Sequence, residues 1–130
     1  MKLLLDVNAL VAFGFFHHEF HSRVINWMQA EESPTLLTCS ITELRFVRIL
    51  SQVPAYQSSV AKARDLLLEL KSNRIIPLEF VPDANDITCL PGWVKVPKQT
   101  TDGHLVQLAA AHGAVLATLD SGIPGAYLIS

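Results

Sequence analysis

The stretch TTDGHLVQLAAAHGAVLATLD, residues 100–120, contains a helix, a helix-ending glycine and a strand in direct succession. Residues 102–112 form the predicted helix, and Gly113 supplies the left-handed C-terminal cap that glycine adopts without strain. The apolar run at residues 114–118 then predicts a buried strand, which ends just before Asp120. A short buried strand that follows a helix in this way is typical of an α/β sheet.

The same alternation extends outward over the rest of the chain. Further strands are predicted at residues 2–5, 35–38, 74–81 and 127–129, and Pro77 makes the third of these an edge or interrupted strand. Further helices are predicted at residues 8–13, 19–30, 40–50 and 58–71. Residues 82–99 form a proline-rich loop with a short element within it. We therefore expect one α/β domain over residues 1–130, with a mostly parallel central sheet flanked by helices on both faces.

Composition narrows the possible functions. With 10 basic and 12 acidic residues the net charge is −2, so RNA binding would have to use a local basic rim and metal ions. Asp6 interrupts the apolar N-terminal run, which argues against a signal peptide or a membrane span. The two cysteines form no CxxC pair, and the sequence has no GxGxxG or GxxxxGK[ST] loop. We expect a cytoplasmic protein without membrane association and without nucleotide-driven chemistry.

Four acidic residues adjoin the predicted strands. Asp6 directly follows the first strand, and Glu43 lies in the first turn of the helix after the second strand. Asp120 follows the strand at residues 114–118, and Asp102 begins the helix that precedes it. Because parallel strands end at one edge of a sheet, where such folds bind ligands, we expect all four carboxylates at that edge.

Each acid also has a purely structural explanation. Glu43 follows Ser40 at the spacing of a capping box, and Asp6 can cap the helix that begins after it. Asp102 can favour a helix dipole, and Asp120 can be a turn residue. Together, however, they favour a metal site, because two carboxylates about 4 Å apart repel by about 4 kcal/mol at an effective dielectric near 20. Such oxygen ligands select Mg²⁺ or Mn²⁺, and one or two ions remain possible.

Three neighbouring polar residues are candidates for support or for substrate contact. Asn8 can orient Asp6 or a metal-bound water, or it can cap a helix. Thr101 can bond a carboxylate or the scissile phosphate, or it can be a helix cap. Arg45 can pair with a carboxylate, contact phosphate or form a solvated ion pair.

A histidine cluster lies between the first two predicted helices. His17, His18 and His21 form this cluster, and the sequence HEFH does not match the HExxH metalloprotease motif. We expect a partly exposed polar rim near the first loop, within reach of RNA. A metal shared by His18 and His21 is the alternative.

Three segments resemble the successive motifs of PIN-domain ribonucleases, and most of all the VapC-type toxins of bacterial toxin–antitoxin pairs. They are LLDVNALVAF (residues 4–13), TCSITELRFVRIL (residues 38–50) and the stretch at residues 100–120. The resemblance implies a PIN-like fold and an Mg²⁺- or Mn²⁺-dependent endoribonuclease. It makes Asp6, Glu43 and Asp102 catalytic metal ligands, with Asp120 as a fourth acid acting directly or through water. It also implies an RNA substrate, an inhibitory cognate antitoxin that covers the site, and a homodimer.

The sequence leaves two other functions open. A non-catalytic PIN-like module would bind RNA or a protein partner through the same edge, and the four intact acids count against it. A phospho-receiver domain also has an acidic pocket at strand ends. It requires an acidic pair after the first strand and a lysine after the last, whereas LLDVN has a single acid and no lysine follows Asp120.

Overall fold

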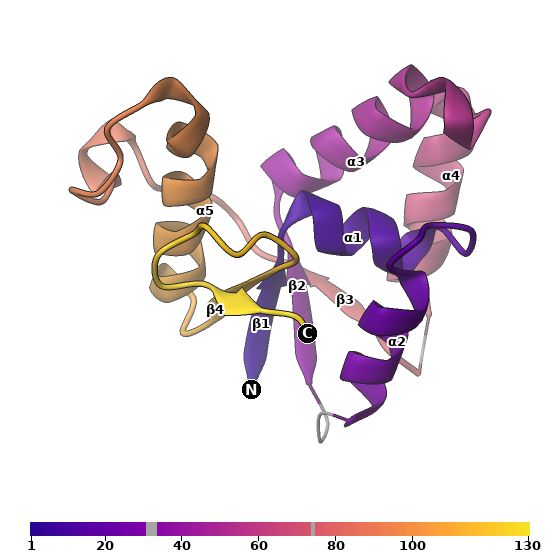
Figure 1. Cartoon of the computed structure of the whole chain (residues 1–130), viewed down its shortest axis with the longest axis horizontal. Coiled ribbons are helices and arrows are strands. Elements are labelled where there is room, and N and C mark those ends of the chain that lie inside the picture. Colours follow the sequence, from indigo (N-terminus) through magenta and orange to yellow (C-terminus); the bar gives the residue numbers. More distant parts are fainter. Residues whose placement is uncertain (31–33, 74) are drawn as a thin grey trace.

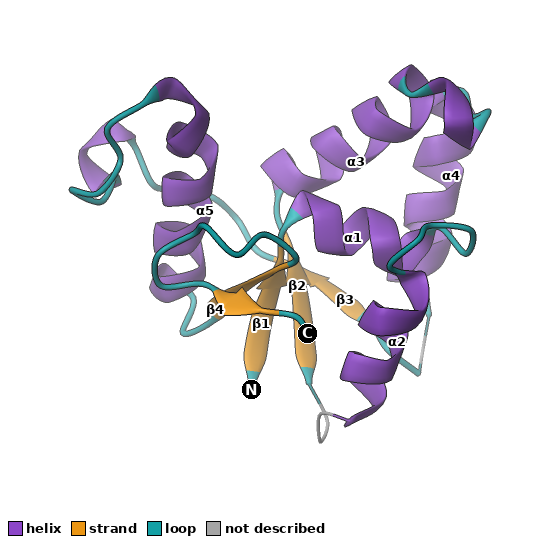
Figure 2. Cartoon of the chain, in the orientation of Figure 1, coloured by secondary structure: helices purple, strands orange, loops and turns teal. Residues whose placement is uncertain are grey.

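The computed structural model describes residues 1–30, 34–73 and 75–130, which form a five-stranded parallel sheet covered by helices (Figures 1 and 2). The strands are β1 (Lys2–Leu5), β2 (Thr35–Thr38), β3 (Leu78–Phe80), β4 (Val115–Thr118) and β5 (Tyr127–Leu128). The helices are α1 (Val7–Gly14), α2 (His21–Ala30), α3 (Ser40–Gln52), α4 (Val60–Lys71) and α5 (Thr100–Ala111). Short 3₁₀ helices are η1 (Pro54–Tyr56), η2 (Ile87–Cys89) and η3 (Pro97–Gln99).

Strand β1 is a run of leucines because both of its faces are buried. The strand order is β3-β2-β1-β4-β5, so β1 is central and has a parallel neighbour on each side. Successive side chains of a strand point to opposite faces. Leu3 and Leu5 pack into one buried cluster and Leu4 packs into another, and all three are fully buried. A central strand of this kind requires helices on both sides of the sheet.

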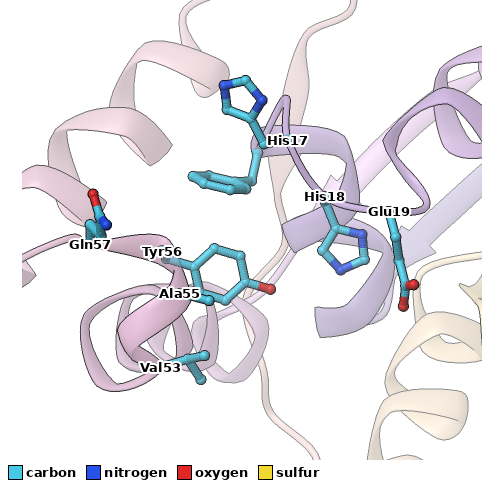
Figure 3. A pocket seen from close by; sticks show the side chains of 8 residues that line it. His17, His18, Glu19, Val53, Ala55, Tyr56 and Gln57 are labelled. Atoms are coloured by element: carbon cyan, nitrogen blue, oxygen red, sulfur yellow. The ribbon is translucent and has the colours of Figure 1, made fainter.

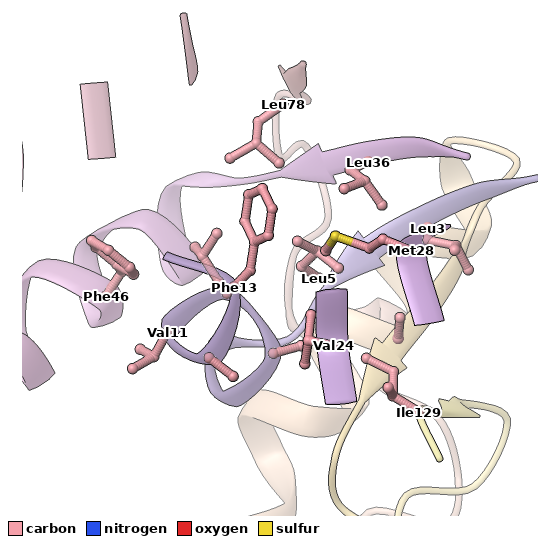
Figure 4. Packing of buried hydrophobic residues seen from close by; sticks show 14 of the residues in the cluster. Leu3, Leu5, Val11, Phe13, Val24, Met28, Leu36, Phe46, Leu78 and Ile129 are labelled. Atoms are coloured by element: carbon pink, nitrogen blue, oxygen red, sulfur yellow. The ribbon is translucent and has the colours of Figure 1, made fainter. Parts of the chain in front are cut away.

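The helices are divided unequally between the two faces. Helices α1 to α4 contribute to the cluster that contains Leu3 and Leu5, part of which is drawn in Figure 4 with Phe13, Val24 and other side chains. On the opposite face, α5 supplies Leu105, Leu108 and Ala109 to the cluster around Leu4. Figure 1 shows α5 on one side of the strands and α1 to α4 on the other.

The expected α/β fold is confirmed, with shifts at several element ends. The sheet is parallel throughout, since each of its four strand pairs is parallel. The strand expected at residues 74–81 is limited to β3, directly after Pro77, and residue 74 lies outside the described residues. The helix expected at residues 19–30 begins at His21, whereas the helix expected from residue 102 begins at Thr100.

The chain path brings three helix N-termini to the carboxyl edge of the sheet. Helices α1 and α3 begin directly after β1 and β2, and α5 begins at this edge because it runs back before entering β4. The neighbouring strands β1 and β4 also end here. Across residues 1–30, 34–73 and 75–130, no helix has the length and apolar character needed to traverse a lipid bilayer.

Candidate active site

Asp6 is the most deeply buried acid at the carboxyl edge of the sheet, with 5% of its surface exposed. It caps α1, because its Oδ1 accepts a hydrogen bond of 2.8 Å from the backbone N–H of Val7. Its other oxygen, Oδ2, accepts a bond of 2.8 Å from the hydroxyl of Thr118. Burial raises the pKa of the Asp6 carboxyl, and these two bonds and the Arg45 charge only partly oppose that shift. The capping explanation of Asp6 is therefore right, but it accounts for only one oxygen.

Thr118 connects two of the candidate acids and was missed by the sequence analysis. It is the last residue of β4 and is fully buried. Its hydroxyl donates to Asp6 and accepts bonds from the Asn8 side-chain amide at 3.2 Å and from the Asp120 backbone N–H at 3.1 Å. A hydroxyl has one donor and two acceptor positions, so Thr118 uses all of them.

Asp102 and Asp120 are within electrostatic reach of Asp6. Burial, followed by the charges of Asp6 and Asp120, raises the pKa of the Asp102 carboxyl. The Arg45 guanidinium lowers it, so Arg45 lies near the acids although it forms no ion pair within the described ranges. Asp102 lies in the first turn of α5, as expected, and Asp120 accepts a bond of 2.8 Å from the Gly122 backbone N–H in a turn. The structure thus brings three aspartates from three distant segments to one edge.

Glu43 lies near the same edge but has different partners. Its Oε2 accepts a bond of 2.5 Å from the Thr38 hydroxyl and one of 2.8 Å from the Lys71 ammonium group. The suggested capping box between Ser40 and Glu43 is wrong. Cys39 is the N-cap of α3, and the Thr42 hydroxyl supplies the local backbone contacts. The side chain of Glu43 is therefore free of any capping role.

Asn8 does not contact Asp6 directly, and Thr101 does not cap a helix. The Asn8 carbonyl oxygen accepts a bond of 3.2 Å from the Leu119 N–H, and its amide reaches Asp6 only through Thr118. Thr101 lies inside the first turn of α5, whose N-cap is Gln99, so it is not the helix cap. Its side chain makes no hydrogen bond within the part of the chain that the structure describes.

The donor set fits a hard divalent cation. Hard cations prefer carboxylate oxygens, and three mutually repelling aspartates with Arg45 beside them have an uncompensated negative charge. Asp102 makes no hydrogen bond or ion pair among residues 1–30, 34–73 and 75–130. Within those residues no three His, Cys, Asp or Glu side chains are grouped tightly enough to ligate one ion. Cation binding therefore requires these side chains to move closer together.

Two buried threonines and one lysine are the residues that sequence reasoning missed. Thr38 and Thr118 each end an apolar strand, are fully buried and donate to an acid. A threonine at the last position of a buried strand was a usable signal, because a buried hydroxyl needs a partner. Lys71 is 28 residues from Glu43 in the sequence, and no local pattern predicts their contact.

The histidine cluster at residues 17–21 lies away from the acids, beside a separate cavity. His17 and His18 line a cavity of about 640 Å³ together with Phe15, Glu19 and Tyr56 (Figure 3). This cavity adjoins the C-terminal end of α1, and α1 has eight residues, or roughly 12 Å, between it and the end capped by Asp6. The Nδ1 of His18 accepts a bond from the Phe20 N–H and the Nδ1 of His21 contacts the Ala12 carbonyl oxygen, so a shared metal would have to use the Nε2 atoms. Among the described residues, these histidines belong to no group of three metal-ligating side chains.

An apolar groove between α3 and α4 opens beside Glu43. It has a volume of about 710 Å³ and contains the exposed side chains of Leu44, Val60, Leu68 and Phe80. Arg48 and Arg64 also line it. Large apolar side chains that gather on one exposed surface are typical of a protein interface.

The chain is similar to known proteins in sequence over nearly its whole length. The family model of the PIN domain matches residues 3–127. Two curated relatives from Mycobacterium tuberculosis are named Ribonuclease VapC38 and Ribonuclease VapC44. VapC38 is 34% identical, with 92% of this chain and 86% of the relative covered. VapC44 is 37% identical, with 95% and 89% covered.

Solved structures agree on the fold. The VapBC2 complex of Rickettsia felis, bound to a DNA fragment from its promoter, matches with a TM-score of 0.62 at 17% identity. That match covers 98% of this chain and 97% of the other. VapC20 of Mycobacterium tuberculosis, described as a Sarcin-Ricin loop cleaving toxin, matches with a TM-score of 0.61 at 10% identity. It covers 93% of this chain and 92% of the other.

Proposed function

The chain belongs to the PIN-domain family, among its VapC-type ribonucleases, and from that premise we propose that it is an endoribonuclease toxin that uses Mg²⁺ or Mn²⁺. The observation that carries the proposal is the convergence of Asp6, Asp102 and Asp120, with raised pKa values at the first two, beside the positive charge of Arg45. A binding module without catalysis has no need of this repulsive arrangement, and the curated relatives are named ribonucleases.

The proposed cation ligands are Asp6, Glu43 and Asp102, and Asp120 is the fourth acid, which acts through water. When bound, a divalent cation supplies positive charge that activates water and stabilises the negative charge of the transition state. Thr118 orients Asp6 through Oδ2, and Asn8 holds Thr118 in place. These two residues therefore act on the acids and not on the substrate.

Three residues are assigned to the substrate side of the reaction. Arg45, exposed beside the acids, binds a non-bridging oxygen of the scissile phosphate. Asp120 uses Oδ1 for Gly122, so its other oxygen orients the attacking water by accepting a hydrogen bond. Thr101 donates its hydroxyl to the same phosphate. RNA hydrolysis then leaves a 5′-phosphate and a 3′-hydroxyl.

We propose that a cognate antitoxin inhibits the enzyme by covering the acidic edge and the adjoining groove between α3 and α4. The groove supports this because its exposed apolar side chains are continuous with Glu43. We also propose a cytoplasmic location, because Cys39 and Cys89 are both free thiols, and a homodimer, which the resemblance to VapC-type toxins implies. Light scattering of the purified chain measures the oligomeric state, and a monomer at micromolar concentration contradicts the dimer.

The activity is tested by expressing wild type, Asp6→Asn and Asp102→Asn, with Asp65→Asn as a matched control on the exposed side of α4. We expect wild type and Asp65→Asn to arrest growth and to cleave RNA with Mn²⁺ but not with EDTA. We expect the two site variants to fold and to lose more than 100-fold in cleavage rate. Equal toxicity in all four strains contradicts the site assignment. Absence of cleavage by pure wild type with Mn²⁺ favours the non-catalytic module instead.

A further inference from the structure

Lys71 is held at the acidic edge by two contacts, although it comes from the last turn of α4. Its ammonium nitrogen lies 2.8 Å from Oε2 of Glu43, and the same nitrogen lies 5.2 Å from the centre of the Phe80 ring. Thr38 donates to the same oxygen of Glu43. The two side chains of the ion pair are only 26% and 20% exposed, so solvent screens this pair less than a fully exposed one.

The charges at this edge give Lys71 a role beyond local structure. Four carboxylates are balanced by two cationic side chains, Arg45 and Lys71, which leaves a net charge of −2 if all six are ionised. Lys71 neutralises Glu43 in particular, because it is the cation in direct contact with that acid. A divalent cation that binds Glu43 must approach the same carboxylate that the ammonium group already contacts.

Two effects of Lys71 on cation binding oppose each other. By holding Glu43, Lys71 reduces the conformational entropy that this one side chain loses when it becomes a ligand. Its positive charge also repels a divalent cation. The energy of this repulsion is twice the energy for a monovalent cation at the same distance. Thr38 also holds Oε2, so the orienting effect persists without Lys71, whereas the repulsion does not. Repulsion is therefore the larger effect.

We propose that Lys71 is the resident counter-ion of Glu43 and competes with the divalent cation for this carboxylate, so that Lys71 lowers the cation affinity of the acidic site. This inference rests on the proposed function, because it assumes that the acids bind a divalent cation. Lys71 touches neither substrate nor cation, so it acts through Glu43 as a positioning residue.

Calorimetric titration of the full-length chain with Mn²⁺, in the absence of RNA, tests the inference independently of cleavage. We expect Lys71→Met and Lys71→Gln to bind Mn²⁺ at least tenfold more tightly than wild type. Lys71→Arg keeps the charge and should stay within about threefold of wild type. The matched control is Lys62→Met, which removes an exposed lysine near the other end of α4 and should leave the affinity unchanged. Loss of structure would weaken binding, so tighter binding separates the proposed role from a structural one.

A double-variant cycle shows whether Lys71 acts through Glu43. In the Glu43→Gln background the ion pair is gone, and removal of Lys71 should change the Mn²⁺ affinity by less than about threefold. Unchanged or weaker binding by both Lys71→Met and Lys71→Gln overturns the inference while leaving the proposed function intact. An equal gain in both backgrounds overturns it as well, because Lys71 would then repel the cation at long range and not through its contact with Glu43. Failure of wild type and all variants to bind Mn²⁺ overturns the inference and the metal assignment together.

Discussion

At the residue scale, the hydroxyl of Thr118 is the contact on which the geometry of the aspartates depends most. Thr118→Val removes a hydroxyl from a fully buried position and takes away the Thr118 partner of the Asp6 Oδ2, the Asn8 side-chain amide and the Asp120 N–H. We expect the free energy of unfolding to fall by about 2 kcal/mol. The Tm should fall by roughly 8 °C for a domain of this size. Cleavage should fall by roughly 10- to 100-fold, the usual effect of losing a residue that orients metal ligands.

Two variants control for this substitution. Thr118→Ser keeps the hydroxyl and should retain most of the activity and stability. Thr35→Val makes the same change at the start of β2, where the threonine hydroxyl has no hydrogen bond to any described residue, and should be nearly neutral. Thermal melts and cleavage rates measure both. If Thr118→Val is as stable and as active as Thr35→Val, the Thr118 contacts do not organise the site.

The burial of Asp6 leads to a prediction about stability and pH. Because burial raises the pKa of Asp6 above its ordinary value of 3.8, the folded chain binds this proton more tightly than the unfolded chain. Stability therefore decreases as pH rises through the raised pKa, and the full cost of the buried charge is present at neutral pH. Without divalent cations, Asp6→Asn should raise the free energy of unfolding at pH 7 by about 1 kcal/mol, or the Tm by roughly 4 °C.

This gain should disappear near pH 3, where the wild-type carboxyl is protonated in both states. Added Mn²⁺ should reverse the order at pH 7, because only wild type then gains the binding free energy of the cation. Melting curves at pH 3 and pH 7, with and without Mn²⁺, measure all four values. A metal-free Asp6→Asn protein that melts below wild type at pH 7 would show that the carboxylate stabilises the fold.

At the scale of the elements, the local sequence pattern predicted most strands and helices, but it did not predict the side-chain contacts that join their ends. Leucine runs and helix periodicity carry enough information for β1, β2, β4 and all five α-helices, because burial on both faces is a property of each segment alone. The three aspartates were placed at one edge by topology, through the rule that parallel strands end together. The Thr118–Asp6 and Lys71–Glu43 contacts join residues 112 and 28 positions apart, so no local pattern contains them.

The first turn of α5 gives a prediction about how one element positions an acid. A Cβ on Gly103 would lie 2.3 Å from Cγ2 of Val94 and 3.2 Å from Cδ of Pro91, so the loop at residues 91–94 packs directly against the helix beside Asp102. Gly103→Ala adds about 1 kcal/mol of helix propensity. The clash outweighs this gain, because the Val94 side chain is short and cannot move away. We expect a net loss of about 1–2 kcal/mol in the free energy of unfolding.

The same substitution should also reduce cleavage, because α5 must shift and Asp102 shifts with it. Gly92→Ala is the matched control from the same loop, since its new Cβ would meet no atom within 4 Å. Chemical denaturation and cleavage rates compare the two variants. A Gly103→Ala protein that is more stable than wild type would show that the loop accommodates the methyl group and does not hold the start of α5.

At the scale of the whole molecule, the net charge of −2 determines how RNA is attracted. Phosphates that approach the carboxyl edge meet acids whose known counter-charges are Arg45 and Lys71, and Lys71 is already paired. A bound divalent cation is therefore needed for RNA binding as well as for cleavage. We expect EDTA to weaken RNA binding at least tenfold relative to Ca²⁺, another hard cation with oxygen ligands. Fluorescence anisotropy measures the affinity, and a gel confirms that the RNA stays intact.

The dependence of this affinity on salt separates the two possible sources of attraction. If few basic side chains contact phosphate, the plot of log affinity against log salt has a slope of about −1 to −2, because each phosphate contact with single-stranded RNA contributes about −0.7. Arg45→Ala should make the slope shallower by about one contact. Arg23→Ala removes an arginine of α2 that stacks on the Phe20 ring, and it should leave the slope unchanged. A slope steeper than about −4, together with equal affinity in EDTA and Ca²⁺, would mean that a basic surface elsewhere on the chain binds the RNA.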